Sequence, residues 1–144
     1  MASNAVKQRS TLMACGRYTF EIKQGETFYR RINYKDSAGQ PIDLSGYHAR
    51  LQLRPSAGSS TVYLTLSSSI GSDGSGLNFT PTSASVVLPE SSGSIGITIS
   101  AFSSSQLTFT EAVGDLFIMS GSGVSEFRDN LLDLRARVIR RVTE

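Results

Sequence analysis

The stretch that most constrains the fold runs from Tyr18 to Arg54. It contains three runs in which apolar and polar side chains alternate, and two clusters of turn-forming residues separate these runs. A period of two residues places successive side chains on opposite faces of a β-strand, so each run predicts a strand with one buried face. This stretch alone therefore predicts half of a β-sandwich.

The first two runs flank a predicted bend. Arg17 to Lys23 and Glu26 to Lys35 each read as a strand, and Gly25 between them predicts a bulge or bend that redirects the chain. The side chains expected on the buried faces are Tyr18, Phe20 and Ile22 in the first run, and Phe28, Ile32 and Tyr34 in the second. Arg30 shares the face of the second group, so its aliphatic stem is expected to lie over apolar surface.

Two turns precede the third run. Asp36 to Pro41 is a turn by composition, in which Gly39 can adopt a positive φ. In Asp43-Leu44-Ser45-Gly46, the Asp and Ser side chains can bond their own backbone, while the Leu is expected in the core. Tyr47 to Arg54 then alternates strictly. Its inward residues are Ala49, Leu51 and Leu53, and its outward residues are His48, Arg50, Gln52 and Arg54.

The rest of the chain predicts further short strands. The candidates are Val62–Leu66, Leu77–Phe79, Val86–Leu88, Ser94–Ser100, Val113–Ser120, Val124–Phe127 and Leu131–Val142. The serines of residues 103–109 suit the cap of a single helical turn. Residues 131–139 could form a helix by propensity, but their period of two favours a strand. Seven to nine strands without a long amphipathic helix predict an all-β sandwich.

The length of 144 residues suits one domain. We expect residues 17–144 to form the sandwich and residues 1–16, which have no clean period, to form an extended N-terminal arm. The arm is either a frayed terminus or a segment that becomes ordered on a partner.

The net charge of +2 is too small to indicate a nucleic-acid partner. Basic residues crowd both ends of the chain, whereas Asp73 and Glu90 are the only charges between Pro55 and Thr110. That middle region either stays soluble through its hydroxyl groups or lies against a neighbour. No run of about 18 apolar residues is present, so no membrane span is predicted, and the N-terminus lacks the apolar core of a signal peptide.

No catalytic or metal-binding constellation is apparent, so neither enzymatic activity nor a cofactor is expected. The single histidine, His48, lies on the polar face of a strand, and the single cysteine, Cys15, excludes an internal disulfide. Residues 71–76 resemble a calcium loop only superficially, because Asp73 is their one carboxylate. A pair of carboxylates could converge from Glu21, Glu26, Asp115 and Glu126, but nothing in the sequence selects a pair.

The basic residues instead suggest a docking surface for protein. No interleaved aromatic platform accompanies the C-terminal arginines, which favours a protein partner over nucleic acid. The candidate interface residues are Lys7 and Arg9 in the arm, His48, Arg50 and Arg54 in the third run, and Arg135, Arg137, Arg140 and Arg141 near the end.

Several motifs resemble, in order, a module of tailed-phage virion proteins. They are Gly25-Glu26-Thr27-Phe28, Gly39-Gln40-Pro41, Asp43-Leu44-Ser45-Gly46, the strand Ala49–Arg54, the serine-rich turn Ser103–Thr108, Gly114-Asp115-Leu116 and Val142-Thr143. The module is similar to the immunoglobulin-like N-terminal domain of baseplate upper proteins. The resemblance spans residues 18–144 and implies an immunoglobulin-like antiparallel β-sandwich.

The resemblance also implies a function. It indicates a non-enzymatic structural component of a tailed-phage virion, assembled in the host cytoplasm and packed on the tail or baseplate by contacts with other virion proteins in multiple copies. A capsid cement or decoration protein is the alternative within this class. A carbohydrate-binding adhesion module is the alternative from another class, although the chain has no Trp to stack on a sugar. No membrane, nucleic-acid or small-molecule partner is expected.

Overall fold

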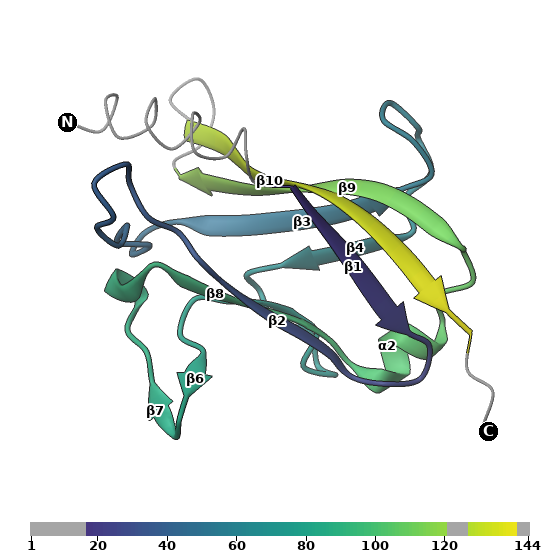
Figure 1. Ribbon diagram of the computed structural model, residues 1–144, viewed down its shortest axis with the longest axis horizontal. Helices are drawn as coiled ribbons and strands as arrows, with labels where there is room; N and C mark the ends of the chain where they lie inside the picture. The colour runs from purple at the N-terminus through teal and green to yellow at the C-terminus, as the bar shows by residue number, and fades with distance from the viewer. Residues whose placement is uncertain (1–16, 121–126, 141–144) are drawn as a thin grey trace.

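The computed structural model describes residues 17–120 and 127–140, and within them the chain is an all-β sandwich (Figure 1). The first sheet has five strands in the order β1-β10-β9-β3-β4, and the second has three in the order β2-β8-β5. The five strands are β1 (Arg17–Lys23), β10 (Phe127–Ile139), β9 (Glu111–Ser120), β3 (His48–Arg54) and β4 (Leu64–Ser67). The three are β2 (Phe28–Asn33), β8 (Ser94–Ile99) and β5 (Gly76–Asn78).

The remaining elements are short. A hairpin of β6 (Thr82–Ser83) and β7 (Val86–Val87) projects from the sandwich below the three-stranded sheet (Figure 1). A 3₁₀ turn, η1, spans Glu90–Ser92, and the one α-helix within the described residues is α2 (Ala101–Ser105). No helix in this part of the chain has the length and apolar character needed to cross a bilayer.

The predicted fold class is confirmed, with two differences. The described residues hold ten strands instead of seven to nine, partly because β6 and β7 form a hairpin of two-residue strands. The sheets are also not purely antiparallel, since β1 pairs with β10 in parallel. Because Gly25 (φ 86°) bends the chain after β1, β2 enters the opposite sheet and β1 is left beside the last strand.

The strand order follows that of a variable-type immunoglobulin sandwich. Lettered in that scheme, β2, β8 and β5 take the places of strands B, E and D, while β10, β9, β3 and β4 take those of G, F, C and C′. The disulfide that joins strands B and F in antibody domains cannot form here, because the sequence has a single cysteine.

The core lies between the two sheets. Leu51 and Leu53 of β3 and Leu116 of β9 face Ile97 and its neighbours in β8, and all of these side chains are buried. The ring centroids of Phe20 in β1 and Phe28 in β2 lie 4.9 Å apart across the bend. This aromatic contact packs the two sheets against each other there. The predicted inward faces of β1, β3, β8 and β10 are therefore confirmed, except that Tyr18 is 47% exposed at the start of its strand.

The predicted turns are also confirmed. Gly39 and Gly46 adopt φ values of 82° and 80°, which favour glycine. The Asp43 Oδ1 accepts a hydrogen bond from the Ser45 amide at 2.9 Å, and Leu44 is fully buried. The turn that carries part of the family resemblance therefore anchors the chain to the core just before β3.

Two predictions near the C-terminal half need adjustment. The helical turn begins at Ala101 instead of Ser103, because the Ser100 hydroxyl caps it by accepting a bond from the Ser103 amide. Residues 131–139 do form a strand, but it is the end of the thirteen-residue β10, which starts at Phe127 and bulges between Asn130 and Leu132. The predicted strand Val124–Phe127 otherwise lies outside the described residues, as do the arm and Cys15.

The substitution Gly114→Ala tests the close contact between β9 and β3. A Cβ at this position would lie 2.3 Å from the backbone oxygen of Gln52, so Gly114→Ala forces these two paired strands apart. We expect a loss of about 1–3 kcal/mol in the free energy of unfolding, measured by urea denaturation.

The matched control is Gly96→Ala in β8, whose Cβ would meet only side-chain atoms, at 3.2 Å. This substitution should cost clearly less, because side chains move more easily than a paired backbone. Equal losses for the two variants would contradict the register of β9 against β3.

Candidate interaction surface

The candidate surface is the outer face of the five-stranded sheet, meaning the face directed away from the core. Because side chains alternate along each strand, this face carries the odd-numbered residues of β1 and β9, the even-numbered residues of β3, and the odd-numbered residues of β10 after its bulge. The strand register aligns these side chains in rows that cross the sheet.

Two neighbouring rows carry most of the charge. The first, the acidic row, contains Arg17, Asp133, Asp115 and Gln52 from β1, β10, β9 and β3. The second, the basic row, contains Thr19, Arg135, Val113 and Arg54 from the same strands. The two rows are adjacent on the face because their residues are two positions apart along every strand.

The structure brings several predicted interface residues together on this face. His48, Arg50 and Arg54 project from β3, and Arg135 and Arg137 project from β10, two strands away. Arg137 lies 3.8 Å from Glu21 of β1 in an exposed ion pair. Arg140 is exposed just beyond the end of β10, while Lys7, Arg9 and Arg141 lie outside the described residues.

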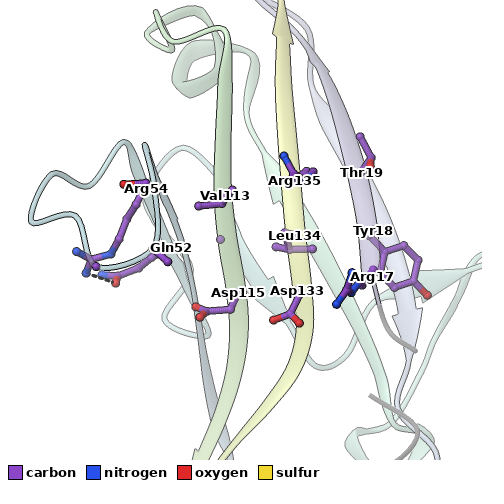
Figure 2. Close-up of a pocket in the computed structure, with 14 residues that line it drawn as sticks. Arg17, Tyr18, Thr19, Gln52, Arg54, Val113, Asp115, Asp133, Leu134 and Arg135 are labelled. Carbon is purple, nitrogen blue, oxygen red and sulfur yellow. Dashed lines mark hydrogen bonds between the residues drawn. The ribbon is translucent and has the colours of Figure 1, made fainter. Parts of the chain in front are cut away.

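The face is hollowed into a groove of about 610 Å³ over β9 and β10. The loop after β3 forms one wall and the start of β1 forms the other (Figure 2). The lining residues are Arg17, Tyr18, Thr19, Gln52, Arg54, Ser56, Ala57, Gly58, Val113, Gly114, Asp115, Asp133, Leu134 and Arg135. The two rows therefore form the floor and rims of this groove.

Asp115 and Asp133 are directly opposite one another on adjacent strands, and their side chains project in the same row (Figure 2). Burial raises the pKa of Asp115 above its ordinary value, and the negative charge of Asp133 raises it further, whereas the Arg54 guanidinium acts in the opposite direction. Like charges placed opposite each other destabilise a sheet. The repulsion between the two carboxylates therefore destabilises the sheet locally, and a nearby cation would reduce this repulsion.

Arg54 is held in place at the edge of the groove. Its guanidinium donates to the backbone oxygen of Ser59 and, at 2.9 Å, to Oε1 of Gln52. The first bond ties the loop after β3 to the strand, so the wall of the groove is braced by one of the predicted interface residues.

The outward side chains of β9, which is the central strand of the sheet, are mostly apolar. Val113, Phe117 and Met119 project outward and are half-buried or buried, and Asp115 lies between Val113 and Phe117. The sequence predicted a central or interface strand here because residues 116–119 are apolar on both faces. The central position is confirmed, and the arginines of β3 and β10 flank these apolar side chains.

Sequence reasoning missed Arg17 and Asp133 as parts of this surface. Their outward position could be read from the alternation of β1 and β10, but their proximity depends on the register between strands. The partner of Asp115 was also missed: it is Asp133, not Glu21, which lies on β1 beside Arg137, and Glu126 is outside the described residues. Within residues 17–120 and 127–140, no three His, Cys, Asp or Glu side chains gather as a metal site would need.

Asp73, in the loop that superficially resembles a calcium site, is held by hydroxyl groups instead. Its Oδ2 accepts bonds from the hydroxyls of Ser100, at 2.6 Å, and Ser103, and its Oδ1 accepts from the Ser75 amide at 3.0 Å. These bonds, led by that from Ser100, hold the pKa of Asp73 well below its ordinary value. The carboxylate thus links the loop before β5 to the start of α2.

Of the comparisons with known proteins, only that with solved structures finds a match. No protein-family model matches the chain, and no curated protein matches it significantly. Among solved structures, the chain is similar to the N-terminal domain of phage TP901-1 ORF48, with a TM-score of 0.45 and 10% sequence identity over 85% of this chain and 84% of that one. A likeness this distant leaves the function to be argued from the chain's own residues.

The Asp73 cluster predicts a specific dependence of stability on pH. Because the folded pKa is lowered, the unfolded chain binds the proton first, and the stabilisation present above about pH 4 is lost as the pH falls further. Asp73→Asn should flatten this acid limb of the unfolding curve, measured by urea denaturation at a series of pH values. Glu26→Gln, which removes an exposed carboxylate outside the cluster, is the control and should leave the limb steep; an unchanged limb in Asp73→Asn would contradict the assignment.

The facing carboxylates predict opposite effects for two variants. Asp133→Asn removes a negative charge and should lower the pKa of Asp115, whereas Arg54→Gln removes a positive charge and should raise it. The measurement is an NMR titration of the Asp115 side-chain carboxyl carbon in dilute protein. A shift in the same direction in both variants would contradict the arrangement of these three groups.

Proposed function

We propose that this chain is a non-enzymatic structural component of a tailed-phage virion, which packs on the tail or baseplate through contacts with other virion proteins. The observation that carries the proposal is the outer face of the five-stranded sheet. There the predicted interface residues of β3 and β10 gather with two carboxylates and with apolar side chains of β9 on one surface.

The composition of this face suits a protein partner. Specific interfaces combine an apolar centre with arginine and a polar rim, and they are depleted in lysine. Here Phe117 and Met119 lie on the central strand, while the basic side chains of the outer face are mostly arginines, with Lys23 at the end of β1. Charged residues of both signs also make the face selective, because a partner must match both.

The motifs that carry the family resemblance support the same proposal. Gly25 to Phe28 forms the bend between the sheets, Asp43 to Gly46 forms the turn before β3, and Gly114 to Leu116 lies in β9. Each motif therefore serves the architecture of the sandwich. This is the expected use in a protein whose role is to present a surface.

A carbohydrate-binding adhesion module is the second candidate, and the groove is the observation that favours it. Its volume of about 610 Å³ falls within the range of small-ligand clefts, and its lining includes Tyr18, carboxylates and arginines that could hydrogen-bond a sugar. Tyr18 is the single aromatic residue among the residues that line the groove, so only one ring is available to stack on a sugar. Binding of the isolated protein to a glycan array at micromolar concentration would favour this candidate over the structural one.

The virion role predicts where the chain is found. Mass spectrometry of purified virions should detect it, and separated heads and tails should place it in the tail fraction. Recovery in the head fraction would favour the capsid cement or decoration protein, and absence from both fractions would contradict the proposal.

The N-terminal arm gives a second test of the same proposal. A chain without residues 1–16 should keep the folded sandwich, judged by circular dichroism and thermal unfolding, because β1 begins at Arg17. It should fail to enter particles when it replaces the full-length chain during infection. Normal incorporation of the truncated chain would show that the arm plays no part in assembly.

A further inference from the structure

We propose that the outer face of the five-stranded sheet binds a second copy of this chain about a two-fold axis. The inference rests on the proposed function, since it names one partner in the packing of multiple copies. It is carried by the order of the charges on the face, which makes the face complementary to itself.

The geometry follows from the two charged rows. In a face-to-face pair, consider a two-fold axis that lies in the plane of contact, runs across the strands and passes between the acidic and the basic row. This axis places the acidic row of each copy opposite the basic row of the other. Asp133 of one copy then faces Arg135 of the second, and Gln52 faces Arg54.

The same axis places further charges favourably. Glu111 of one copy comes to lie opposite Phe117 of the second, whose neighbour in the adjacent strand is Arg50. Asp115 comes to lie opposite Val113, which has Arg135 and Arg54 of the second copy on either side. The arginines of the second copy therefore surround the two facing carboxylates.

Pairing would offset a cost that each copy carries alone. Asp115 and Asp133 repel one another across adjacent strands, and the partial burial of Asp115 adds to the penalty for its negative charge. Arginine matches carboxylate geometry with two hydrogen bonds, so arginines from a second copy are suited to this site.

The area of the face predicts a weak dimer. Five strands about 4.8 Å apart and seven residues at about 3.4 Å each give roughly 450 Å² per copy in projection, or about 900 Å² for the pair. The real surface is larger than its projection, because side chains and the walls of the groove make it uneven. The total is therefore close to the lower limit for specific interfaces, roughly 1,000–1,200 Å². A contact of this size gains strength when a larger assembly holds many copies side by side.

The test uses two exposed residues of β10 whose charges can be exchanged. Asp133→Arg and Arg135→Glu each place like charges opposite each other in the proposed homodimer, so each variant alone should dimerise about tenfold or more weakly than the wild-type chain. A mixture of the two variants should form a heterodimer, because all the facing charges are then opposite. The double variant D133R/R135E should recover the homodimer.

Association is measured by sedimentation velocity from micromolar to millimolar concentration at low salt, where charge pairing is strongest. The control pair is Glu26→Arg and Arg31→Glu, which change exposed charges before and within β2, on the other sheet, and should not alter association. Thermal unfolding of each variant checks that the sandwich is intact. Should Asp133→Arg fail to fold beside Arg17, Arg135→Glu alone still decides the matter, because in its homodimer a new carboxylate would face Asp133 of the other copy.

Recovery of association by mixing and by the double variant supports the two-fold interface. A wild-type chain that stays monomeric at millimolar concentration overturns it, as does a dimer that the single charge reversals leave unchanged. A monomer that dimerises only after removal of residues 1–16 also overturns it, since the face would then be covered by the chain's own terminus. Detection of the chain in purified virions tests the proposed function separately, so the two ideas can fail independently.

Discussion

The burial of one face of the five-stranded sheet determines which side chains lie on its other face. Because side chains alternate along a strand, a slip of one residue would expose Leu51, Leu116 and Leu134 and bury the charged residues beside them. The fully buried aliphatic side chains of β3, β9 and β10 therefore determine the register of this sheet. The rows of charge on the outer face are a consequence of packing on the inner one.

This coupling explains how a chain in which only 18% of the residues are charged can present a specific surface. The parallel pairing of β1 with β10 brings Arg17 beside Asp133, although these residues are far apart in the sequence. The antiparallel pairing of β10 with β9 brings Asp133 beside Asp115. Four segments of the sequence, including the loop after β3, thus contribute to one groove, and the buried core holds them in place.

The sequence predicted the architecture well where local patterns decide it. The strands around Phe20, Leu51 and Ile97 follow from strict alternation, and the turns at Gly39 and Gly46 follow from residues that favour positive φ. The family resemblance implied the immunoglobulin-like arrangement, and the order of strands in the two sheets agrees with it. Local patterns were weaker at α2, where a serine earlier than expected provides the cap.

The sequence predicted the direction of individual side chains on the candidate surface, but not which of them lie side by side. Alternation shows which way Arg54 and Arg135 point, but it does not show which strands are neighbours or which residues are opposite each other. The pairing of Asp115 with Asp133 depends on that register, and on a bulge at Leu131 that shifts the start of β10 by one residue. Alternation therefore predicted the outward direction of the basic residues in β3 and β10, while the carboxylates that lie beside them were not recognised.

We propose that the outer face of the five-stranded sheet is a protein interface in a phage particle. The decisive measurement is an electron cryomicroscopy map of the virion at a resolution that separates β-strands. We expect repeated copies of this sandwich in the tail, with the acidic and basic rows covered by a neighbouring protein chain. A map in which this face is open to solvent in every copy, or in which the sandwich is absent, would contradict it.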